Sequence, residues 1–290
     1  MKILITGCNG QVGHCLVDQL TDKADVLALN KNKLDITDQA AVASVVSQFM
    51  PDYIINAAAY TAVDKAEEDM DLSFAINRDG AKYLADAANS CDAVMLHIST
   101  DYVFDGEGHE PYKENDIVAP QSVYGQSKLA GELAVAEACH QHLILRTAWV
   151  FGEHGNNFVK TMLRLGEGRD ALRIVGDQFG GPTYAGDIAS ALIKMVEYIE
   201  QKKSPEWGIY HFSGTPYVSW YEFAENIFQK AQSYSVLEKT PSLSSISTSE
   251  YPTPAKRPAN SCLDCGKIEK QFGIEPSDWQ ASLDNIKSYK

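Results

Sequence analysis

Short apolar runs alternate with amphipathic segments through the first half of the chain, and this alternation restricts the fold most. The runs are rich in Ile, Val and Leu and predict strands that are buried on both faces; they cover residues 2–6, 25–29, 52–58, 93–99 and 143–150. The segments between them have apolar residues three and four positions apart, as in helices with one buried face; they cover residues 10–20, 38–49, 72–89 and 123–138. Repeated strand–helix units in this order predict an α/β fold with a doubly wound parallel sheet.

The pattern becomes less regular after about residue 150. The expected elements there are helices over residues 155–168, 184–201, 219–231 and 279–290, and a strand over residues 208–214. Residues 233–258 are rich in Ser, Thr and Pro, so we expect an irregular loop. We therefore expect residues 1–150 to form the sheet domain. Residues 151–290 should form a smaller mixed α/β part, interleaved with the first, that covers the sheet edge where a substrate would bind.

A glycine-rich turn follows the first predicted strand. In "ILITGCNGQVG", Gly7, Gly10 and Gly13 stand between a strand and a helix. Glycine permits a tight turn and lets a pyrophosphate approach the helix N-terminus, where free N–H groups and the helix dipole favour negative charge. Three glycines can also occur in a plain strand–helix turn. Their place at the start of a strand–helix–strand unit favours a Rossmann-type dinucleotide-binding domain.

The end of the second predicted strand bears on which dinucleotide is bound. A carboxylate about 20 residues after the turn would bind the adenosine ribose hydroxyls of NAD. Asn30 stands at that point instead, followed by Lys31 and Lys33, so no carboxylate opposes a 2′-phosphate. The same residues also fit a polar surface turn. We predict NADPH as the cofactor, with NADH as a second donor that could serve.

Small residues end the third predicted strand. Ala57, Ala58 and Ala59 are followed by Tyr60 and Thr61. Small side chains at the carboxyl end of a central strand let a cofactor lie close to the backbone. Alanines in a crowded contact between sheet and helix would give the same pattern, so this stretch alone does not decide between the two interpretations.

Four polar residues form the candidate reaction centre. Thr100 and Asp101 end the fourth predicted strand, and open α/β sheets bind ligands at that edge. Tyr124 and Lys128 lie one helical turn apart on a predicted helix. A nearby ammonium should lower the pKa of the phenol, which is ordinarily about 10. Tyr124 could then exchange a proton while the Thr100 hydroxyl stabilises charge on a carbonyl oxygen.

Each part of this group also has an ordinary structural explanation. A Tyr–Lys pair four residues apart occurs on exposed helices, and a Thr at a strand end often caps a helix. The combination of a glycine-rich turn, a hydroxyl at a strand end and a following Y-x-x-x-K is much less common by chance. We therefore interpret Tyr124 and Lys128 as a proton donor and the group that tunes it.

These motifs resemble the extended short-chain dehydrogenase/reductase family. Further stretches, covering nearly the whole chain, are similar to its dTDP-4-dehydrorhamnose reductase branch; they are "NAAAYTAVDKAE", "STDYVFDG", "VYGQSKLAGE", "RTAWVFG", "NNFVKTML", "DQFGGPT" and "YPTPAKRPANS". The resemblance implies NAD(P)H-dependent reduction of the 4-keto group of dTDP-4-dehydro-6-deoxy-L-mannose. The product would be dTDP-L-rhamnose, a precursor of cell-surface polysaccharide.

The resemblance also implies roles for single residues. Tyr124 would donate a proton to the nascent alkoxide, Lys128 would tune it and hold the nicotinamide ribose, and Thr100 would orient the keto oxygen. Asp101 and Trp149 would contact the sugar, although Trp149 also fits a core aromatic. The remaining residues would line the dinucleotide: Gly10, Gln11, Val12, Asp35, Ile36, Ala59, Tyr60 and Thr61. For the substrate diphosphate, Lys160, Arg173 and Arg257 are candidates by charge and position only.

Some members of the family hold magnesium between subunits with acidic residues. Here the glycine-rich turn is followed by His14 and Cys15, and Gly186 stands where a carboxylate would be expected. We therefore expect no metal and a monomer or metal-free homodimer. The "CLDC" spacing at Cys262 and Cys265 has no second ligand pair and is attributed to chance.

The net charge of −14 argues against a nucleic-acid surface and against an anionic membrane partner. The short apolar N-terminus is unlike a signal peptide, and no apolar run of ~18 residues occurs, so we expect a cytoplasmic protein.

Two alternative functions are compatible with parts of this pattern. A nucleotide-sugar epimerase or dehydratase could use the same scaffold, but dehydratases of this group tend to carry a second acidic residue where Tyr102 follows Asp101. A non-catalytic NADP-binding regulatory subunit would not need Thr100, Tyr124 and Lys128 together.

Overall fold

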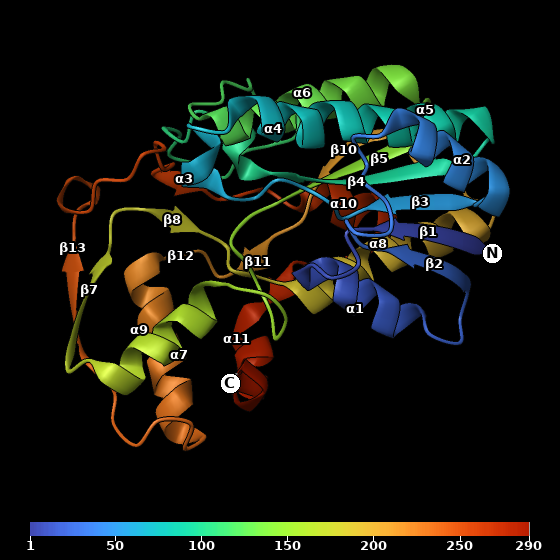
Figure 1. Ribbon diagram of the computed structural model, residues 1–290. Helices are drawn as coiled ribbons and strands as arrows, with labels where there is room; N and C mark the ends of the chain where they lie inside the picture. Colours follow the sequence, from blue (N-terminus) through green and yellow to red (C-terminus); the bar gives the residue numbers. More distant parts are fainter. Residues whose placement is uncertain (290) are drawn as a thin grey trace.

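A six-stranded, all-parallel sheet forms the centre of the computed structural model, which describes residues 1–289 (Figure 1). The strand order is β2-β1-β3-β4-β5-β10. The chain therefore winds outward from β1 in both directions, which places a switch point between β1 and β3. The strands are β1 Lys2–Thr6, β2 Asp25–Leu29, β3 Tyr53–Asn56, β4 Val94–Thr100, β5 His142–Thr147 and β10 Gly208–His211. This confirms the predicted doubly wound parallel sheet.

Helices cover both faces of this sheet (Figure 1). One layer contains α1 Gln11–Leu20, α8 Ala185–Glu200 and α10 Gly266–Phe272; the other contains α2 Gln39–Phe49, α5 Ala81–Ser90 and α6 Val123–Ala138. Short helices α3 Val63–Ala66 and α4 Met70–Phe74 lead into a π-helix over Ala75–Gly80, which continues directly into α5. The predicted helix over residues 72–89 is thus one continuous rod with a π-turn inside it.

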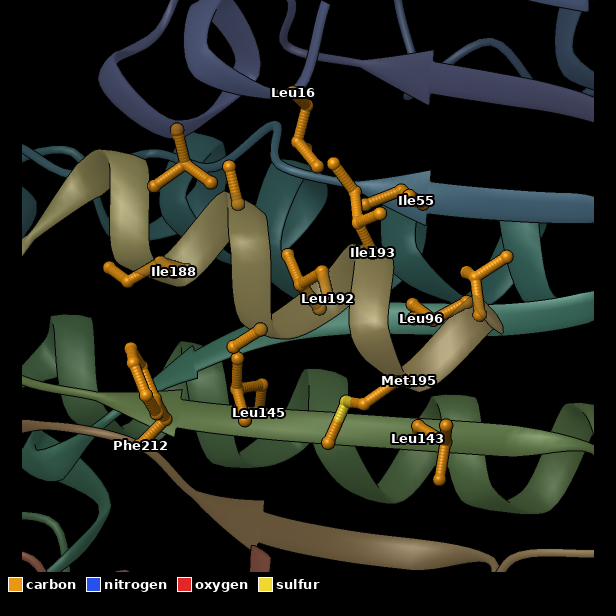
Figure 2. Close-up of a cluster of buried hydrophobic side chains, with 14 of the residues drawn as sticks. Leu16, Ile55, Leu96, Leu143, Leu145, Ile188, Leu192, Ile193, Met195 and Phe212 are labelled. Carbon is orange, nitrogen blue, oxygen red and sulfur yellow. The ribbon is translucent and has the colours of Figure 1, made fainter. Parts of the chain in front are cut away.

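Successive side chains of each central strand pack into the hydrophobic cores on opposite faces of the sheet. Ile3 and Ile5 pack toward α1 and α8, whereas Leu4 between them packs toward α2 and α5. Figure 2 shows the first core, where Leu192 of α8 lies close to Leu96 of the sheet. Fully burying one such side chain contributes ~1.5–3 kcal/mol, so both strand faces need their helix layer.

The remaining elements form a smaller lobe around a core of their own (Figure 1). Its helices α7 Phe158–Gly168 and α9 Trp220–Ser233 pack together, beside the parallel pair β7 Ala171–Val175 and β13 Ser242–Ile246. The lobe is not made of consecutive residues alone, because α8 and β10 follow residue 150 yet belong to the sheet layers. The division of the chain at residue 150 stays a prediction.

One sequence-based expectation about the C-terminal part was wrong. The predicted loop over residues 233–258 contains strand β13, whose backbone pairs with β7 although most of its side chains are Ser. The predicted last helix is confirmed over the described residues: it is an α-helix over Trp279–Ser282 (α11) and then 3₁₀-helical over Leu283–Tyr289, with a kink at Asn285. Lys290 of that prediction lies outside the described residues. Within residues 1–289, no helix is long and apolar enough to cross a membrane.

Candidate active site

The glycine-rich turn packs directly against the end of β3. Gly7 has φ +73°, and a Cβ on it would lie 2.6 Å from the backbone nitrogen of Ala58. A Cβ on Gly13 would lie 2.2 Å from the carbonyl oxygen of Gly7. Both positions therefore exclude a side chain, because backbone atoms cannot move aside as a flexible side chain can. The small Ala57–Ala58 stretch and the glycines form one close contact at the switch point of the sheet.

Helix α1 begins at this turn without a side-chain cap. Its N-cap residue is Gly10, so no side chain satisfies the N–H groups of the first turn, which remain suited to an anion. Gln11 and Val12 stand in that first turn, and Val12 is buried. The Gln11 side chain accepts a hydrogen bond of 3.0 Å from Asn157 Nδ2, which ties the turn to the N-cap residue of α7.

The end of β2 carries the residues predicted to contact the adenosine side. Asn30 Oδ1 accepts hydrogen bonds from the backbone nitrogens of Asn32 and Lys33, and so closes a local turn. Asp35 is likewise engaged locally, because it accepts from the backbone and hydroxyl of Thr37, and the backbone bond lowers its pKa. Ile36 is buried in the core beside α5.

The loop after β3 is held by a residue that the sequence analysis missed. Asn77 lies in the π-helix and is 1% exposed. Its side chain accepts from the backbone nitrogen of Tyr60 at 2.8 Å, and donates to the Tyr60 carbonyl at 3.1 Å and to Ser127 of α6 at 2.9 Å. It thus fixes the Ala59–Thr61 loop against the helix that carries Tyr124. No sequence pattern reveals this role, because it depends on the π-turn that brings Asn77 to Tyr60 and Ser127.

Thr100 and Asp101 lie at the carboxyl end of β4, and both are buried. Thr100 Oγ1 donates a hydrogen bond of 3.0 Å to Asp101 Oδ1 and accepts one of 3.3 Å from the Tyr102 backbone. Burial raises the pKa of Asp101 to about 6. Among residues 1–289, Asp101 Oδ2 and the hydroxyls of Ser99 and Thr147 are buried polar atoms without a hydrogen-bond partner. Buried polar atoms are seldom left unpaired, so this edge of the sheet is prepared for a polar ligand.

Tyr124 stands in the first turn of α6, whose start is fixed by two contacts. The Ser122 side chain caps the helix by accepting from the Gly125 backbone, and Glu67 accepts from the Val123 backbone at 2.9 Å. The Thr100 hydroxyl lies near the Tyr124 phenol and acts to lower its pKa. The structure thus brings Tyr124, Thr100 and Asp101 into one row of polar side chains.

Lys128 lies one turn further along α6 and is 2% exposed. Its Nζ donates a hydrogen bond of 2.6 Å to the carbonyl of Ile98 in β4. Burial lowers the pKa of Lys128 to about 8, and the charge of Glu132 opposes this change.

The predicted net lowering of the Tyr124 pKa was wrong for this structure. Burial raises the pKa of Tyr124 above its ordinary value of 10, and the nearby Thr100 hydroxyl offsets this only in part. The physical reason is that both side chains are withdrawn from water, while the Lys128 ammonium is hydrogen-bonded to the backbone of β4. Tyr124 therefore stays a neutral phenol at neutral pH.

A buried ion pair lies behind Lys128. Arg146 at the end of β5 binds Glu132 of α6 through two hydrogen bonds, Nε to Oε1 at 2.9 Å and Nη2 to Oε2 at 2.7 Å. Both side chains are 2% exposed, and the guanidinium also lies 5.0 Å from the ring centroid of Phe104. Glu132 follows Lys128 by four positions on α6. Lys128 binds β4 and Glu132 binds β5, so these two side chains join α6 to both strands next to the site.

Trp149 follows β5 with a left-handed backbone, φ 48°. Its ring stacks on Trp220 at a centroid distance of 3.5 Å and packs over the backbone of Gly180. Trp149 is only partly buried, and it contacts both the small lobe and the cluster around Phe104. A strained aromatic residue at the boundary of two lobes fits a binding wall better than a core position.

The three cations proposed for a diphosphate do not come together. Lys160 donates to the carbonyl of Glu153, and Arg173 pairs with Glu250 on the surface. Arg257 alone lies beside the reaction centre, where it donates to the hydroxyl of Tyr102 at 3.1 Å and pairs with Asp64 at 2.5 Å. It also lines a hollow of about 440 Å³ together with Asp105, Asp177, Thr248 and Tyr251.

The comparison with known proteins decides the family. The model of the RmlD substrate binding domain matches residues 1–289. The chain belongs to this family. It is 52% identical to the dTDP-4-dehydrorhamnose reductase of Aggregatibacter actinomycetemcomitans, over 99% of each chain. Among solved structures, the dTDP-4-dehydrorhamnose reductase of Bacillus anthracis, in complex with NADP, has a TM-score of 0.91 and 38% identity over 100% of this chain and 99% of that one.

Proteins of other activities share this fold at low sequence identity. The UDP-glucose 4-epimerase of Thermus thermophilus, in complex with NAD, has a TM-score of 0.80 over 100% of this chain and 98% of that one, at 21% identity. That likeness shows the α/β fold and not the reaction.

Proposed function

We propose that the chain is an NADPH-dependent oxidoreductase that reduces the 4-keto group of dTDP-4-dehydro-6-deoxy-L-mannose to give dTDP-L-rhamnose. The observation that carries this proposal is the row Tyr124–Thr100–Asp101 at the carboxyl end of β4, with Lys128 buried one turn away. Membership of the family supports it, as do the relatives named for this reaction.

The residues of the turn fit a dinucleotide. Gly7 and Gly13 keep side chains out of the space next to Ala58, and the uncapped N-terminus of α1 offers N–H groups to a pyrophosphate. Asn30, Lys31 and Lys33 present amide and ammonium groups where a 2′-phosphate would lie. When bound there, NADPH would supply the hydride for reduction of the keto carbon. The further residues assigned to the cofactor are Gly10, Gln11, Val12, Asp35, Ile36, Ala59, Tyr60 and Thr61.

The protein's own part in the reaction is the delivery of a proton. A donor must hold its proton at working pH, and burial keeps the Tyr124 phenol neutral by raising its pKa. As the sugar oxygen becomes an alkoxide, the Tyr124 hydroxyl donates to it, because an alkoxide is far more basic than a phenolate. Lys128 keeps its positive charge at pH 7, because its pKa of about 8 lies above that value. This charge would reduce the cost of the phenolate that remains, although it does not outweigh burial in the resting site.

The polar atoms around this row would bind the sugar. Asp101 uses Oδ1 to accept from Thr100, which leaves Oδ2 as an acceptor for a sugar hydroxyl. Trp149 offers an apolar wall on the side of the small lobe. Of the three candidate cations, Arg257 is the best placed for the diphosphate, because it donates a hydrogen bond to Tyr102, the residue after Asp101.

The test is NADPH oxidation, followed at 340 nm, with the keto-sugar nucleotide generated in situ and dTDP-rhamnose identified as product. Tyr124→Phe should keep NADPH binding and lose turnover by ~100-fold or more. Tyr83→Phe, a partly buried tyrosine on α5, is the matched control and should behave like the native protein. Unchanged turnover in Tyr124→Phe would remove the proton-donor role. NADPH binding without any turnover in the native protein would favour the regulatory-subunit alternative.

The cellular setting of the proposal follows the sequence-based expectations. We propose that the protein acts in the cytoplasm on a dTDP-linked keto-sugar, without a nucleic-acid or membrane partner, as a monomer or homodimer. An epimerase or dehydratase remains the alternative, and Tyr102 after Asp101 argues against a dehydratase.

A further inference from the structure

Two histidines and an aspartate meet at the outer side of α1. His14 and Asp18 lie one helical turn apart on α1, and His154 approaches them from the loop after strand β6 Val150–Phe151. One ligand atom from each residue lies within 4.8 Å of those of the other two. The two imidazole rings are stacked, with centroids 4.2 Å apart and planes inclined by 13°. His154 is far from His14 and Asp18 in sequence, so the fold itself brings the third group to the other two.

We infer that His14, Asp18 and His154 form a binding site for a divalent transition-metal ion of the zinc type. Two imidazoles with one carboxylate are a ligand set that suits Zn²⁺, Co²⁺ or Ni²⁺, with water completing the coordination. Mg²⁺ is disfavoured, because it prefers an octahedron of oxygen ligands. The site would hold its ion within a single chain.

The two imidazole rings must rotate before their nitrogens can bind one ion. Zinc–nitrogen bonds are about 2.0–2.1 Å long, and the metal must lie in the plane of each ring. The stacked rings therefore have to tilt apart so that their lone pairs converge on one point. His14 and Asp18 are exposed, and His154 is partly exposed, so no packed core opposes this rotation.

The surroundings favour a cation. Asp18 is itself one of the three ligands, and Glu153 is the chain neighbour of His154. Carboxylates gathered at one place create a negative potential that attracts a metal ion. The Glu153 carboxylate is held by the hydroxyl of Tyr184 at 2.8 Å.

The ion would act as a clamp and not as a catalytic group. His154 belongs to the loop that the Asn157 side chain ties to Gln11 and to the Gly152 carbonyl, at 3.0 and 2.7 Å. A metal bound to both His14 and His154 would add a second link between this loop and α1, close to the glycine-rich turn. None of the three ligands touches the row formed by Tyr124, Thr100 and Asp101.

This inference departs from the sequence-based expectation that no metal is bound. That expectation rested on the lack of carboxylates for a magnesium ion between subunits, at Cys15 and Gly186. The approach of His154 to His14 depends on the tertiary structure, so no local pattern around His14 indicates it.

The experiment uses the full chain, stripped of metal with a chelator that is then removed. Co²⁺ is titrated while its visible d–d absorption is recorded, and Zn²⁺ binding is measured by calorimetry. The variants are His14→Ala, His154→Ala and Asp18→Asn, with the more conservative His14→Gln in case the alanine variant folds poorly. His140→Ala, an exposed histidine outside the cluster, is the matched control. Melting temperature and NADPH binding are recorded for every variant.

We expect one Co²⁺ or Zn²⁺ per chain, a raised melting temperature, and no competition from millimolar Mg²⁺. Losing a group that merely supports a metal ligand weakens binding ~10–100-fold, so loss of either histidine should weaken it by at least ~100-fold. His140→Ala should bind like the native protein. Equal affinity in the native protein and in a folded His14/His154 variant would overturn the site. One ion per two chains, with dimers formed on titration, would overturn the intrachain geometry.

Discussion

The buried ion pair between Arg146 and Glu132 gives the sharpest prediction about stability. Each side chain is 2% exposed, and two hydrogen bonds of 2.9 and 2.7 Å join them. Arg146→Met would leave the buried Glu132 carboxylate without its two hydrogen bonds and its paired charge, with only the more distant Lys128 as a cation. Removing one partner of a buried pair costs about 3–5 kcal/mol, whereas replacing both by apolar groups of similar size is often neutral. We therefore expect Arg146→Met to lose ~3–5 kcal/mol, and Arg146→Met/Glu132→Met to recover most of that loss.

The assay is the free energy of unfolding from urea titrations of the native protein, both single variants and the double variant, monitored by circular dichroism. Lys82→Met is the control, because Lys82 pairs with Asp86 at a distance of 2.7 Å but with 45% and 39% of the side chains exposed. An exposed pair of this type contributes only about 0.3–0.5 kcal/mol. The reasoning is refuted if Arg146→Met loses no more than Lys82→Met, or if the losses of the two single variants simply add in the double variant.

Three further predictions concern the cofactor turn and the pH dependence. Gly13→Ala should abolish NADPH binding, measured by fluorescence titration, because its Cβ would lie 2.2 Å from the Gly7 oxygen; binding at native affinity would contradict the packing of the turn. Asn30→Asp should raise the ratio of NADH to NADPH turnover, since a carboxylate repels a 2′-phosphate and binds ribose hydroxyls; an unchanged ratio would show that Asn30 does not face the ribose. Burial raises the pKa of Asp101 from 3.8 to about 6, so in this window the folded chain holds a proton that the unfolded chain has released, and stability falls as pH rises. The free energy of unfolding of Asp101→Asn, relative to that of the native protein, should therefore increase by up to ~3 kcal/mol between pH 3.5 and pH 7. Urea unfolding at several pH values measures this difference, and a difference that does not change with pH would contradict the prediction.

Local patterns predicted the sheet domain well, because the apolar residues of each strand and helix recur with the period of the face that the element buries. Helix α6 occupies the predicted residues 123–138, and β1 occupies the predicted residues 2–6. Strand β13 was missed because its Ser side chains resemble a loop, while its pairing with β7 depends on backbone groups that no sequence pattern reveals. The last helix was predicted without its type, since apolar spacing does not separate a 3₁₀ helix from an α-helix.

The candidate site was predictable in its chemical parts but not in its electrostatics. Spacing alone placed Thr100, Tyr124 and Lys128 together, because the topology of a parallel sheet brings strand ends to one edge. The raised pKa of Tyr124 depends on burial, which no residue pattern contains. The role of Asn77 depends on a π-turn that aims its side chain at both Tyr60 and Ser127. Contacts between distant segments decide all of these features.

The position of β10 in the sheet has a consequence for synthesis on the ribosome. Strand β5 ends at Thr147, but β10, which covers its open edge, ends at His211, and α8, which covers its face, ends at Glu200. At about 5–20 residues per second, the ~60 residues between them take several seconds to translate. During that interval the nascent chain exposes an unpaired strand edge and an apolar sheet face, which favours association with other chains. The cofactor half of this protein therefore depends on its second half to complete its own folding.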